Sequence, residues 1–347
     1  MKKTFLNKYH HENGGHMVDF SGWEMPINYG SQISEHLSVR ENVGMFDVSH
    51  MAVFDLDGNE QLDFLKSLLP NDVSKIVDKK RALYSPLLNH DGGILDDLIV
   101  YHLGGLNFRI ISNCATRDQN LNWFNEISSG FDVAIDFKSD YSIIAIQGPS
   151  SQSALGNLLK QELQNFHLQM DNEIMIARTG YTGEIGFEIV SNKTIGQEIW
   201  SEFIKLGVKP VGLAARDTLR LEAGYNLYGI DMSIQNNPYD SNLSWTIDLS
   251  DAKRDFIGKK ALERNKKSDE ILCGFYTEER GVLRSGMEIS FKNGGGVITS
   301  GTWSPTFKKN IGLCRISANH PEKGTALLRD KEVNLYFCET NFLKYLK

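Results

Sequence analysis

Two apolar runs on either side of a glycine-rich turn place the strongest constraint on the fold of this chain. The stretch from Tyr84 to Leu103 reads YSPLLNHDGGILDDLIVYHL. Its central Asn-His-Asp-Gly-Gly segment is a turn signal between two strand patterns, so the stretch predicts a β-hairpin. The second run is apolar on both faces apart from two adjacent carboxylates, Asp96 and Asp97. The second run is therefore predicted to be a strand that is buried on both faces and that carries two acidic groups.

The strand period separates these two carboxylates. Successive side chains on a strand point to opposite faces, so Asp96 shares a face with Leu98, and Asp97 shares one with Ile99 and Tyr101. The two groups therefore need not do the same job. One interpretation is structural, with a carboxylate that accepts turn or backbone N–H groups. The other is a partly dry cleft, in which a carboxylate accepts a proton or a hydrogen bond from a substrate nitrogen.

Helical and strand patterns are mixed along the first 250 residues, which predicts an α+β fold. Ser31 is an expected N-cap of a helix that ends before Gly44. The other expected elements are strands at 51–58 and 107–113, a strand pair within 173–191, a βα unit from Tyr141, and helices at 59–70, 116–130 (capped), 193–207 and one ending near Gly224.

The pattern changes after about residue 250. A charged, partly helical linker is followed by short strands that are separated by glycine-rich turns. This pattern is typical of an all-β sandwich or barrel. The chain is therefore expected to have an α+β region at 1–250 and a smaller region at 251–347, which holds the linker and a β domain.

Charge and cysteine content exclude several classes of protein. A net charge of -7 with only short basic groupings argues against nucleic-acid binding. The four cysteines are scattered, without a CxxC pair, so we expect no metal site and a reducing compartment. No secretory signal is visible at the N-terminus, and no apolar run approaches the roughly 20 residues of a membrane span. We expect a cytoplasmic protein without membrane contact.

Further polar residues are candidates for a site. Glu188 stands in an apolar strand, where a buried carboxylate needs either an arginine of this protein or a ligand with an amidine-like N–H pair. Glu184 lies in the preceding turn and is expected to face solvent. Arg216 and Arg220 are four residues apart on one predicted helix, which suits either a salt-bridged helix or an anion site.

Two further groups are less specific. His10, His11 and His16 fit no zinc spacing and are expected on the surface. Several aromatic residues would suit stacking on a flat heterocycle, although aromatic residues in apolar runs are usually core. From the residues alone, the chain is a metal-free cleft enzyme or binder for a flat polar heterocycle.

Longer stretches of the sequence resemble the glycine cleavage T-protein (aminomethyltransferase) family, in order and over nearly the whole chain. They are MVDFSGWEMPINY, FDVSHM, GGILDDLIVY, ISN, AIQGP, RTGYTGEIGFE, GLAARDTLRLEAGYNLYG, LSWTI, RDFIGKKAL and SGTWSPTFKKNIGL. The resemblance implies a three-lobed arrangement with a central cleft. Two interwoven α+β lobes, divided near residues 50 and 140, would form a folate site, and a C-terminal β-barrel would close it.

The resemblance also implies an activity. The lipoylated H-protein would deliver an aminomethyl group, and tetrahydrofolate would take the one-carbon unit as 5,10-methylenetetrahydrofolate while ammonia leaves. Asp97 would be the catalytic carboxylate that hydrogen-bonds the folate N10. The folate-binding positions implied by the family are Glu188 for the pterin, Arg216, Asn113, Met51, Tyr84, Tyr101, Tyr181, Tyr225 and Trp245. Tetrahydrofolate is the co-substrate, and no metal is implied.

The sequence departs from the family at a few positions. Asp240 stands where the family usually has Glu, and Phe342 stands where some members have a substrate-contacting Tyr. Lys344 and Lys347 are candidates for contact with the folate glutamate tail. Two alternatives stay open: a folate-dependent demethylase of a small methylated donor, and a non-catalytic folate-binding protein. The second alternative usually carries a KGCYxGQE-like motif, which is absent here.

Overall fold

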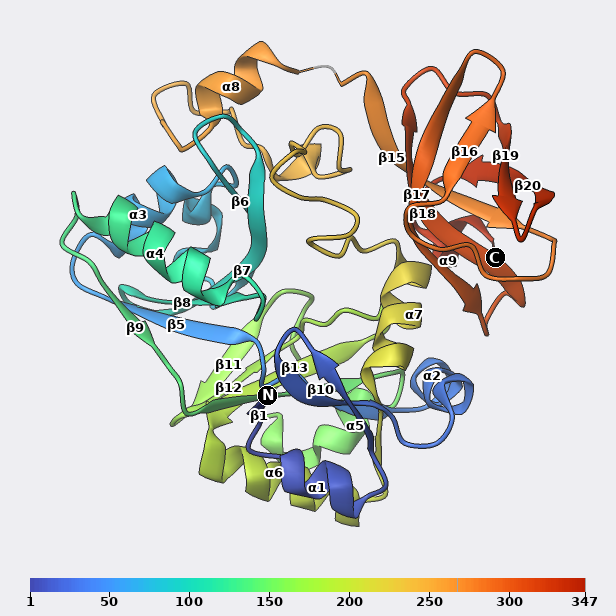
Figure 1. Cartoon of the computed structure of the whole chain (residues 1–347). Helices are drawn as coiled ribbons and strands as arrows, with labels where there is room; N and C mark the ends of the chain where they lie inside the picture. Colours follow the sequence, from blue (N-terminus) through green and yellow to red (C-terminus); the bar gives the residue numbers. More distant parts are fainter. Residues whose placement is uncertain (267, 347) are drawn as a thin grey trace.

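The structure is a computed structural model that describes residues 1–266 and 268–346. Lys347, one of the candidates for the folate tail, therefore lies outside the described residues. Figure 1 shows three bodies of secondary structure, two mixed α/β bodies and a separate β body at the C-terminal end. This arrangement confirms the predicted α+β class with a C-terminal barrel.

The first body is built on a six-stranded sheet with the strand order β11-β12-β13-β10-β4-β14. Its strands are β4 (Gly44–Asp47), β10 (Tyr141–Gln147), β11 (Leu168–Asp171), β12 (Ile174–Ala177), β13 (Gly186–Asn192) and β14 (Lys209–Pro210). A small sheet lies beside it, ordered β1-β3-β2, with β1 (Lys2–Lys3), β2 (His16–Phe20) and β3 (Trp23–Asn28).

The second body is built on a five-stranded sheet with the order β6-β7-β8-β5-β9. Its strands are β5 (Ala52–Asp57), β6 (Ala82–Leu88), β7 (Ile94–Gly104), β8 (Asn107–Ser112) and β9 (Ala134–Phe137). The expected hairpin is present as β6 and β7, which pair antiparallel. All five strands lie between β4 and β10 in the sequence, yet β4 and β10 pair with each other. The chain therefore leaves the first sheet, builds the second, and returns.

The barrel is closed, which decides between the two architectures that the sequence allowed. Its strand order is β15-β18-β17-β16-β19-β20. The bounds are β15 (Glu270–Thr277), β16 (Glu288–Phe291), β17 (Gly294–Ser304), β18 (Lys309–Ser317), β19 (Lys323–Leu328) and β20 (Lys331–Cys338). Closure removes the exposed sheet edges that a short all-β unit would otherwise present.

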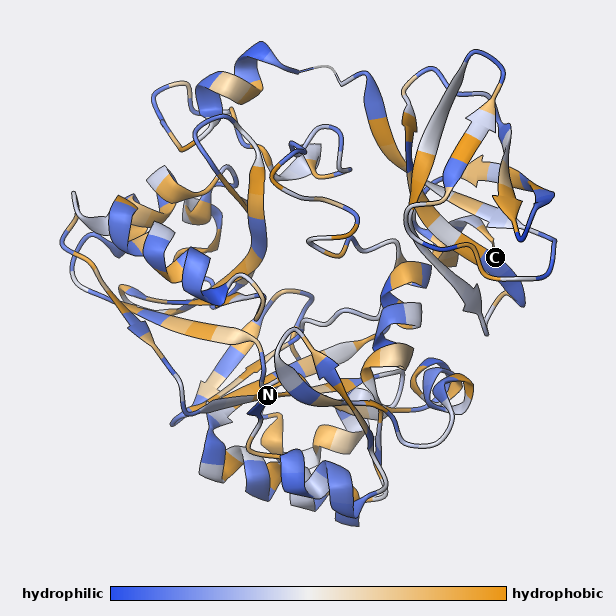
Figure 2. Ribbon diagram, in the orientation of Figure 1, coloured by the Kyte–Doolittle hydropathy of each residue, from blue (hydrophilic) through white to orange (hydrophobic). Residues whose placement is uncertain are grey.

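Nine α-helices occur in the described residues, and most lie where the sequence predicts them. They are α1 (Asn7–Glu12), α2 (Gln32–Glu41), α3 (Gln61–Leu68), α4 (Arg117–Ser128), α5 (Ser151–Leu155), α6 (Lys193–Lys205), α7 (Leu213–Ala223), α8 (Lys259–Arg264) and α9 (Phe342–Tyr345). Ser31 caps α2 as expected, by accepting the Ser34 N–H. Figure 2 shows hydrophilic residues along the turns of α1 and α6.

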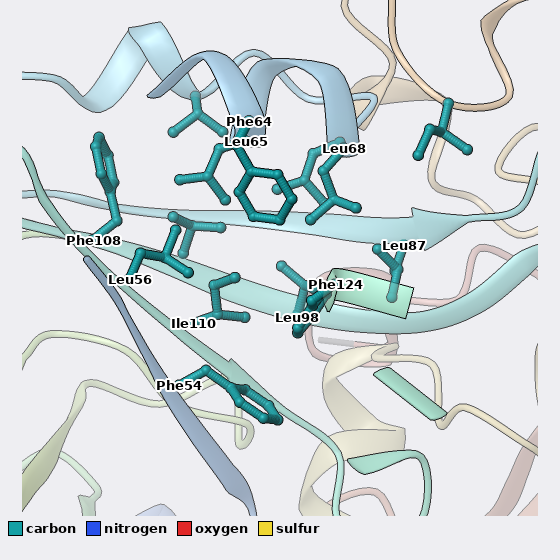
Figure 3. Packing of buried hydrophobic residues seen from close by; sticks show 14 of the residues in the cluster. Phe54, Leu56, Phe64, Leu65, Leu68, Leu87, Leu98, Phe108, Ile110 and Phe124 are labelled. Atoms are coloured by element: carbon teal, nitrogen blue, oxygen red, sulfur yellow. The ribbon is translucent and has the colours of Figure 1, made fainter. Parts of the chain in front are cut away.

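The core of the second body fixes which face of its sheet is free. Helices α3 and α4 cover one face, and Figure 3 shows the apolar side chains between them and the strands. The labelled members of this cluster are Phe54, Leu56, Phe64, Leu65, Leu68, Leu87, Leu98, Phe108, Ile110 and Phe124. Because the helices take this face, the side chains of β7 on the other face are left for a site.

Two local predictions are wrong. Thr116 precedes α4 but makes no side-chain cap, because its hydroxyl donates to Asp96 Oδ2 at 2.6 Å. His10 is buried rather than on the surface, and its Nε2 lies 2.8 Å from Asp47 Oδ2. Both side chains are bound by partners distant in the sequence, which local patterns do not reveal.

Candidate functional site

One cavity of about 550 Å³ gathers the ten residues for which the family resemblance implied a catalytic or binding role. The two sheets and the loop between α7 and η3 (Ser244–Thr246) supply its wall. The predicted residues in that wall are Met51, Tyr84, Asp97, Tyr101, Asn113, Tyr181, Glu188, Arg216, Tyr225 and Trp245. They come from segments nearly 200 residues apart, so the folded chain assembles the cavity from both mixed bodies.

Asp97 faces this cavity from the middle of β7. Its Oδ2 accepts the Tyr84 hydroxyl at 3.0 Å, and its Oδ1 accepts Asn113 Nδ2 at 2.8 Å. Burial, together with the nearby charge of Asp96, raises the pKa of Asp97 from 3.8 to about 7. A carboxyl group with a pKa near neutrality is suited to take up a proton during a reaction at physiological pH.

Asp96 points to the opposite face, as the strand period predicted. It is fully buried and accepts hydrogen bonds from Asn113, Thr116 and Asn120, the last two of which belong to the start of α4. All of these donors are neutral. Asp96 therefore has the surroundings of a structural hydrogen-bond acceptor, whereas Asp97 faces the cavity.

Glu188 is buried in β13 and its partners are hydroxyl groups. Its Oε2 accepts the Thr179 hydroxyl at 2.6 Å and the Tyr101 hydroxyl at 3.4 Å. Glu188 forms no ion pair with any residue that the structure describes, although its carboxylate lies on the cavity wall. The intramolecular salt bridge that the sequence allowed is therefore not formed. A buried carboxylate without a cation is suited to a ligand that brings N–H donors.

The loop that precedes Glu188 is held by one buried amide, that of Gln147. Gln147 Nε2 donates to the Thr179 carbonyl at 3.2 Å, and its Oε1 accepts the Thr182 hydroxyl at 2.9 Å. Gly180 and Gly186 pack directly against this amide, and a Cβ at either position would collide with it. Two of the three glycines of the RTGYTGEIGFE stretch are thus explained by a close approach of backbone to side chain.

Arg216 and Arg220 have separate surroundings, although both lie on α7. Arg220 pairs with Asp217 at 2.8 Å and with Asp231 at 2.6 Å, which is the salt-bridged arrangement. The Arg216 side chain has no hydrogen bond or ion pair within the described part of the chain, and its guanidinium lies 4.5 Å from the Tyr181 ring centroid. Burial lowers the pKa of Arg216. Arg216 is therefore a cation without an ion-pair partner among the described residues, and it lies at the cavity wall.

Two pairs of stacked aromatic rings line the cavity. Tyr84 and Trp245 have centroids 5.7 Å apart with an interplanar angle of 22°, and Tyr181 and Tyr225 have 5.7 Å and 21°. Trp245 is 64% exposed, which is high for a ring of this size. Flat exposed rings at a cavity favour stacking on a planar ligand.

Several wall residues were not singled out from the sequence. Thr179 and Arg178 lie in the RTGYTGE stretch, which itself marks the region, and Asn226 is fixed by its bond to the Ser241 carbonyl at 2.7 Å. Asn226 also accepts the Tyr181 hydroxyl through its carbonyl. Only a three-dimensional contact identifies Asn226, because no local pattern distinguishes it.

Four further residues from the sequence analysis have surroundings of their own: Glu184, Asp240, Phe342 and Lys344. Glu184 does not simply face solvent, because its Oε1 accepts Arg40 Nη1 at 2.9 Å. Asp240 pairs with Arg315 of the barrel at 3.3 Å. Phe342 is fully buried among apolar residues under the barrel and does not line the cavity. Lys344 is exposed, and its contact with folate stays a prediction.

The described residues contain no cluster of three His, Cys, Asp or Glu side chains that is arranged to hold a metal ion. None of the helices at residues 1–266 and 268–346 has both the length and the apolar character that a membrane crossing requires.

Two family models together match most of the chain. The GCVT N-terminal domain matches residues 6–251, and the glycine cleavage T-protein C-terminal barrel domain matches residues 271–344. The second match coincides with the strands of the closed barrel.

Curated relatives and a solved structure match over nearly the full length. An aminomethyltransferase of Xylella fastidiosa (strain M23) is 45% identical over 358 residues, covering 99% of this chain and 97% of the relative. One of Francisella tularensis subsp. tularensis (strain FSC 198) is 45% identical over 356 residues, covering 99% and 98%. The crystal structure of glycine cleavage system aminomethyltransferase T from Bartonella henselae has a TM-score of 0.93 at 31% identity, covering 98% of each chain.

Proposed function

Since the chain belongs to the glycine cleavage T-protein family and is an aminomethyltransferase, we propose that its cavity binds tetrahydrofolate with Asp97 at the reacting nitrogen. The observation that carries this proposal is the convergence of all ten predicted site residues on one cavity wall. A carboxylate, an unpaired guanidinium and stacked rings on one wall suit a flat, N–H-rich heterocycle.

The proposed reaction moves one carbon from the lipoyl arm of an H-protein to tetrahydrofolate. Two carbon–nitrogen bonds form, to N5 and N10 of the folate. The carbon–sulfur bond and the carbon–nitrogen bond of the aminomethyl group break. The two protons that N5 and N10 give up end on the dihydrolipoyl thiol and on the departing ammonia, so that atoms and charges balance.

Asp97 is proposed as the general base for the N10 proton. As a carboxylate it accepts a hydrogen bond from that N–H and raises the nucleophilic character of the nitrogen. The pKa of about 7 makes it a stronger base than an ordinary aspartate. Because the base must be ionised, activity is expected to rise with pH through about 7. Tyr84 and Asn113 orient the two carboxylate oxygens by their hydrogen bonds.

Glu188 and Arg216 are proposed to hold the pterin end. Glu188 offers a carboxylate oxygen, Oε1, that accepts no hydrogen bond from a described residue, and so can take an N–H from the ring. Arg216 offers N–H donors toward a ring carbonyl. Tyr101 and Thr179 hold the Glu188 carboxylate in place from behind. The other positions implied by the family, Met51, Tyr84, Tyr181, Tyr225 and Trp245, are proposed as apolar and stacking wall.

The partner and the location are also proposals. An H-protein fits the family, and the cytoplasm fits the four free cysteines of the described chain. The demethylase and the non-catalytic folate binder are less well supported, because the curated relatives at about 45% identity over nearly the full length carry the name aminomethyltransferase.

Replacing Glu188 by glutamine tests the pterin assignment. The change keeps the size of the side chain but removes a charge-assisted acceptor, which is worth about 1.5–3 kcal/mol. The affinity for a stable reduced folate such as 5-formyltetrahydrofolate, measured by calorimetric titration, is therefore expected to fall about 10- to 100-fold.

Glu198→Gln on the exposed side of α6 is the matched control, since it makes the same chemical change away from the cavity. Its affinity should equal that of the wild type. If Glu188→Gln binds the folate as tightly as Glu198→Gln does, Glu188 does not contact the pterin.

A further inference from the structure

Asp96 is an unusual group for the interior of a protein, and its surroundings are specific. It is fully buried and forms no ion pair with a described residue. Its Oδ1 accepts Asn113 Nδ2 at 2.7 Å, and its Oδ2 accepts the Thr116 hydroxyl at 2.6 Å and Asn120 Nδ2 at 2.5 Å. An uncompensated buried carboxylate is costly, so three donors at these distances mark a place built to hold one.

The start of α4 is arranged for this contact rather than for its own cap. Thr116 occupies the N-cap position, where a threonine hydroxyl would normally accept a backbone N–H and stabilise the helix by about 1 kcal/mol. Here the hydroxyl donates to Asp96, and no side-chain cap is formed. The carboxylate also lies at the first turn of a 12-residue helix, where the helix dipole favours negative charge.

One amide group connects Asp96 to Asp97. Asn113 Nδ2 lies 2.7 Å from Asp96 Oδ1 and 2.8 Å from Asp97 Oδ1. The two carboxyl groups are therefore close enough for the charge on one to make ionisation of the other less favourable. Burial raises the pKa of Asp96, and the hydrogen bonds from Asn113, Thr116 and Asn120 oppose that rise. Because Asp96 has three side-chain donors and Asp97 has two, we place the first negative charge of the pair on Asp96.

We propose that Thr116 and Asn120 are positioning residues for Asp97: they hold Asp96 as a buried carboxylate, and this fixed charge, joined through Asn113, makes Asp97 the more basic member of the pair. The inference rests on the proposed role of Asp97 as base. The start of α4 does not line the cavity, so Thr116 and Asn120 act on Asp97 only through Asp96 and Asn113.

Other titratable groups face Asp97, and none of them replaces Asp96. Tyr84 on β6 donates to Asp97, and Tyr181 and Tyr228 face it from the loops before β13 and after α7. Burial raises the pKa of each of these phenols, so all three stay neutral between pH 5 and 9. Cys114 lies near Asp96, and burial raises the pKa of its thiol as well.

Thr116→Val is the most direct test, because it removes the hydroxyl at nearly constant volume. With one donor lost, Asp96 holds a proton more readily, and Asp97 is ionised at lower pH. The acid limb of single-turnover ammonia release is therefore expected to move to lower pH by up to about one unit, the size of one buried hydrogen bond. Thr116→Ser keeps the hydroxyl and is expected to restore the wild-type limb.

A second measurement is independent of activity. The side-chain carboxyl carbons of Asp96 and Asp97 can be titrated by ¹³C NMR in the full-length protein, with Asp97→Asn used for assignment. In the wild type, Asp96 should stay ionised below the pH at which Asp97 takes up its proton, and Thr116→Val should bring the two titrations together. Asn120→Leu, which removes the other α4 donor at similar side-chain size, should act in the same direction.

The outcomes separate this inference from the proposed role of Asp97. If Asp97→Asn keeps full turnover but the carboxyl titrations respond to Thr116→Val, the role of Asp97 fails and the network stands. If Thr116→Val lowers activity without moving either the acid limb or the titrations, the network is merely structural and the inference is wrong. Protonation of Asp96 before Asp97 in the wild type would also overturn it.

Discussion

Asp97→Asn is expected to lower single-turnover ammonia release by about 10²- to 10⁴-fold, the usual contribution of a positioned general base. The amide oxygen of the variant can keep the hydrogen bond from Asn113 Nδ2, and its NH2 group can donate to the Tyr84 hydroxyl oxygen, so the cavity keeps its shape. Binding of 5-formyltetrahydrofolate is therefore expected to stay near the wild-type value. The measurement is a rapid-quench assay at pH 8 with the aminomethyl-loaded carrier and tetrahydrofolate.

Asp91→Asn is the matched control, because it makes the same change in the exposed turn of the same hairpin. It should leave turnover unchanged. Asp96→Asn is expected to cost less than Asp97→Asn, because Asp96 does not face the cavity. Unchanged turnover in Asp97→Asn would reject the assignment, and the reverse order of the two variants would exchange the roles of the two carboxylates.

Asp97→Asn is also expected to change the stability of the protein. The folded-state pKa of Asp97, about 7, lies above its usual 3.8. The native state therefore holds this proton more tightly than the unfolded chain does, and the contribution of Asp97 to stability falls as the pH rises from about 4 to 7. Asp97→Asn should raise the midpoint of thermal unfolding at pH 8, and this gain should vanish towards pH 4.

Glu222→Ala is expected to be the most destabilising of the proposed changes, lowering the free energy of unfolding by about 3–5 kcal/mol. Glu222 lies fully buried on α7. It accepts Arg40 Nε of α2 at 2.9 Å, and the hydroxyls of Ser304 and Thr306 at the end of β17, the latter at 2.8 Å. Removing it leaves the Arg40 guanidinium with Glu184 as its one remaining ion-pair partner among the described residues, and it leaves the Ser304 and Thr306 hydroxyls without this acceptor, at the junction of α2, α7 and the barrel. Urea unfolding at pH 7.5 measures the loss.

The pH dependence of this loss has a definite sign. Burial by itself would raise the pKa of Glu222, but the hydrogen bond from His36, the charge of Arg40 and the Ser304 hydroxyl lower it from 4.5 to about 2. The stabilisation is therefore fully present above about pH 4.5 and is lost as the pH falls towards 2. The difference between wild type and Glu222→Ala should shrink at pH 3.

Glu198→Ala serves as the control for this experiment, because an exposed helical glutamate is expected to change stability by no more than about 0.5 kcal/mol. An equal effect of Glu222→Ala and Glu198→Ala would show that the junction contributes nothing to stability.

Local patterns were sufficient for most of the helices, for the β6–β7 hairpin and for the two faces of β7. The glycine-rich turn fixed the β6–β7 hairpin, and the period of two placed Asp96 and Asp97 on opposite faces, as the structure has them. Ser31 was also found as a cap, because its partner lies only three residues away. Each of these features depends on neighbours in the sequence.

Long-range contacts account for what local patterns missed. Thr116 looks like a cap but bonds to Asp96, 20 residues earlier. His10 looks like a surface residue but bonds to Asp47. Glu184 looks solvent-facing but pairs with Arg40, because α2 lies beside its loop in the folded chain. In all three cases the partner is brought in by the return of the chain from the second sheet to the first, or by packing of distant elements.

The candidate site divides in the same way. The residue types came from the family resemblance, whereas their meeting in one cavity required the interwoven topology. The absence of an arginine partner for Glu188 within the described chain could not be read from the sequence, since Arg216 and Arg220 were equally good candidates there. In the structure, Arg220 forms an ion pair with Asp231, whereas Arg216 lies in the cavity wall.

The most direct test is a reconstituted single turnover with lipoylated H-protein that carries the aminomethyl group. With tetrahydrofolate present, the wild-type protein is predicted to release one ammonia and form one 5,10-methylenetetrahydrofolate for each aminomethyl group consumed. With tetrahydrofolate omitted, release should be slower by orders of magnitude. No ammonia from the loaded carrier, together with folate-dependent removal of a methyl group from a small donor such as an N-methylated amino acid, would contradict the account.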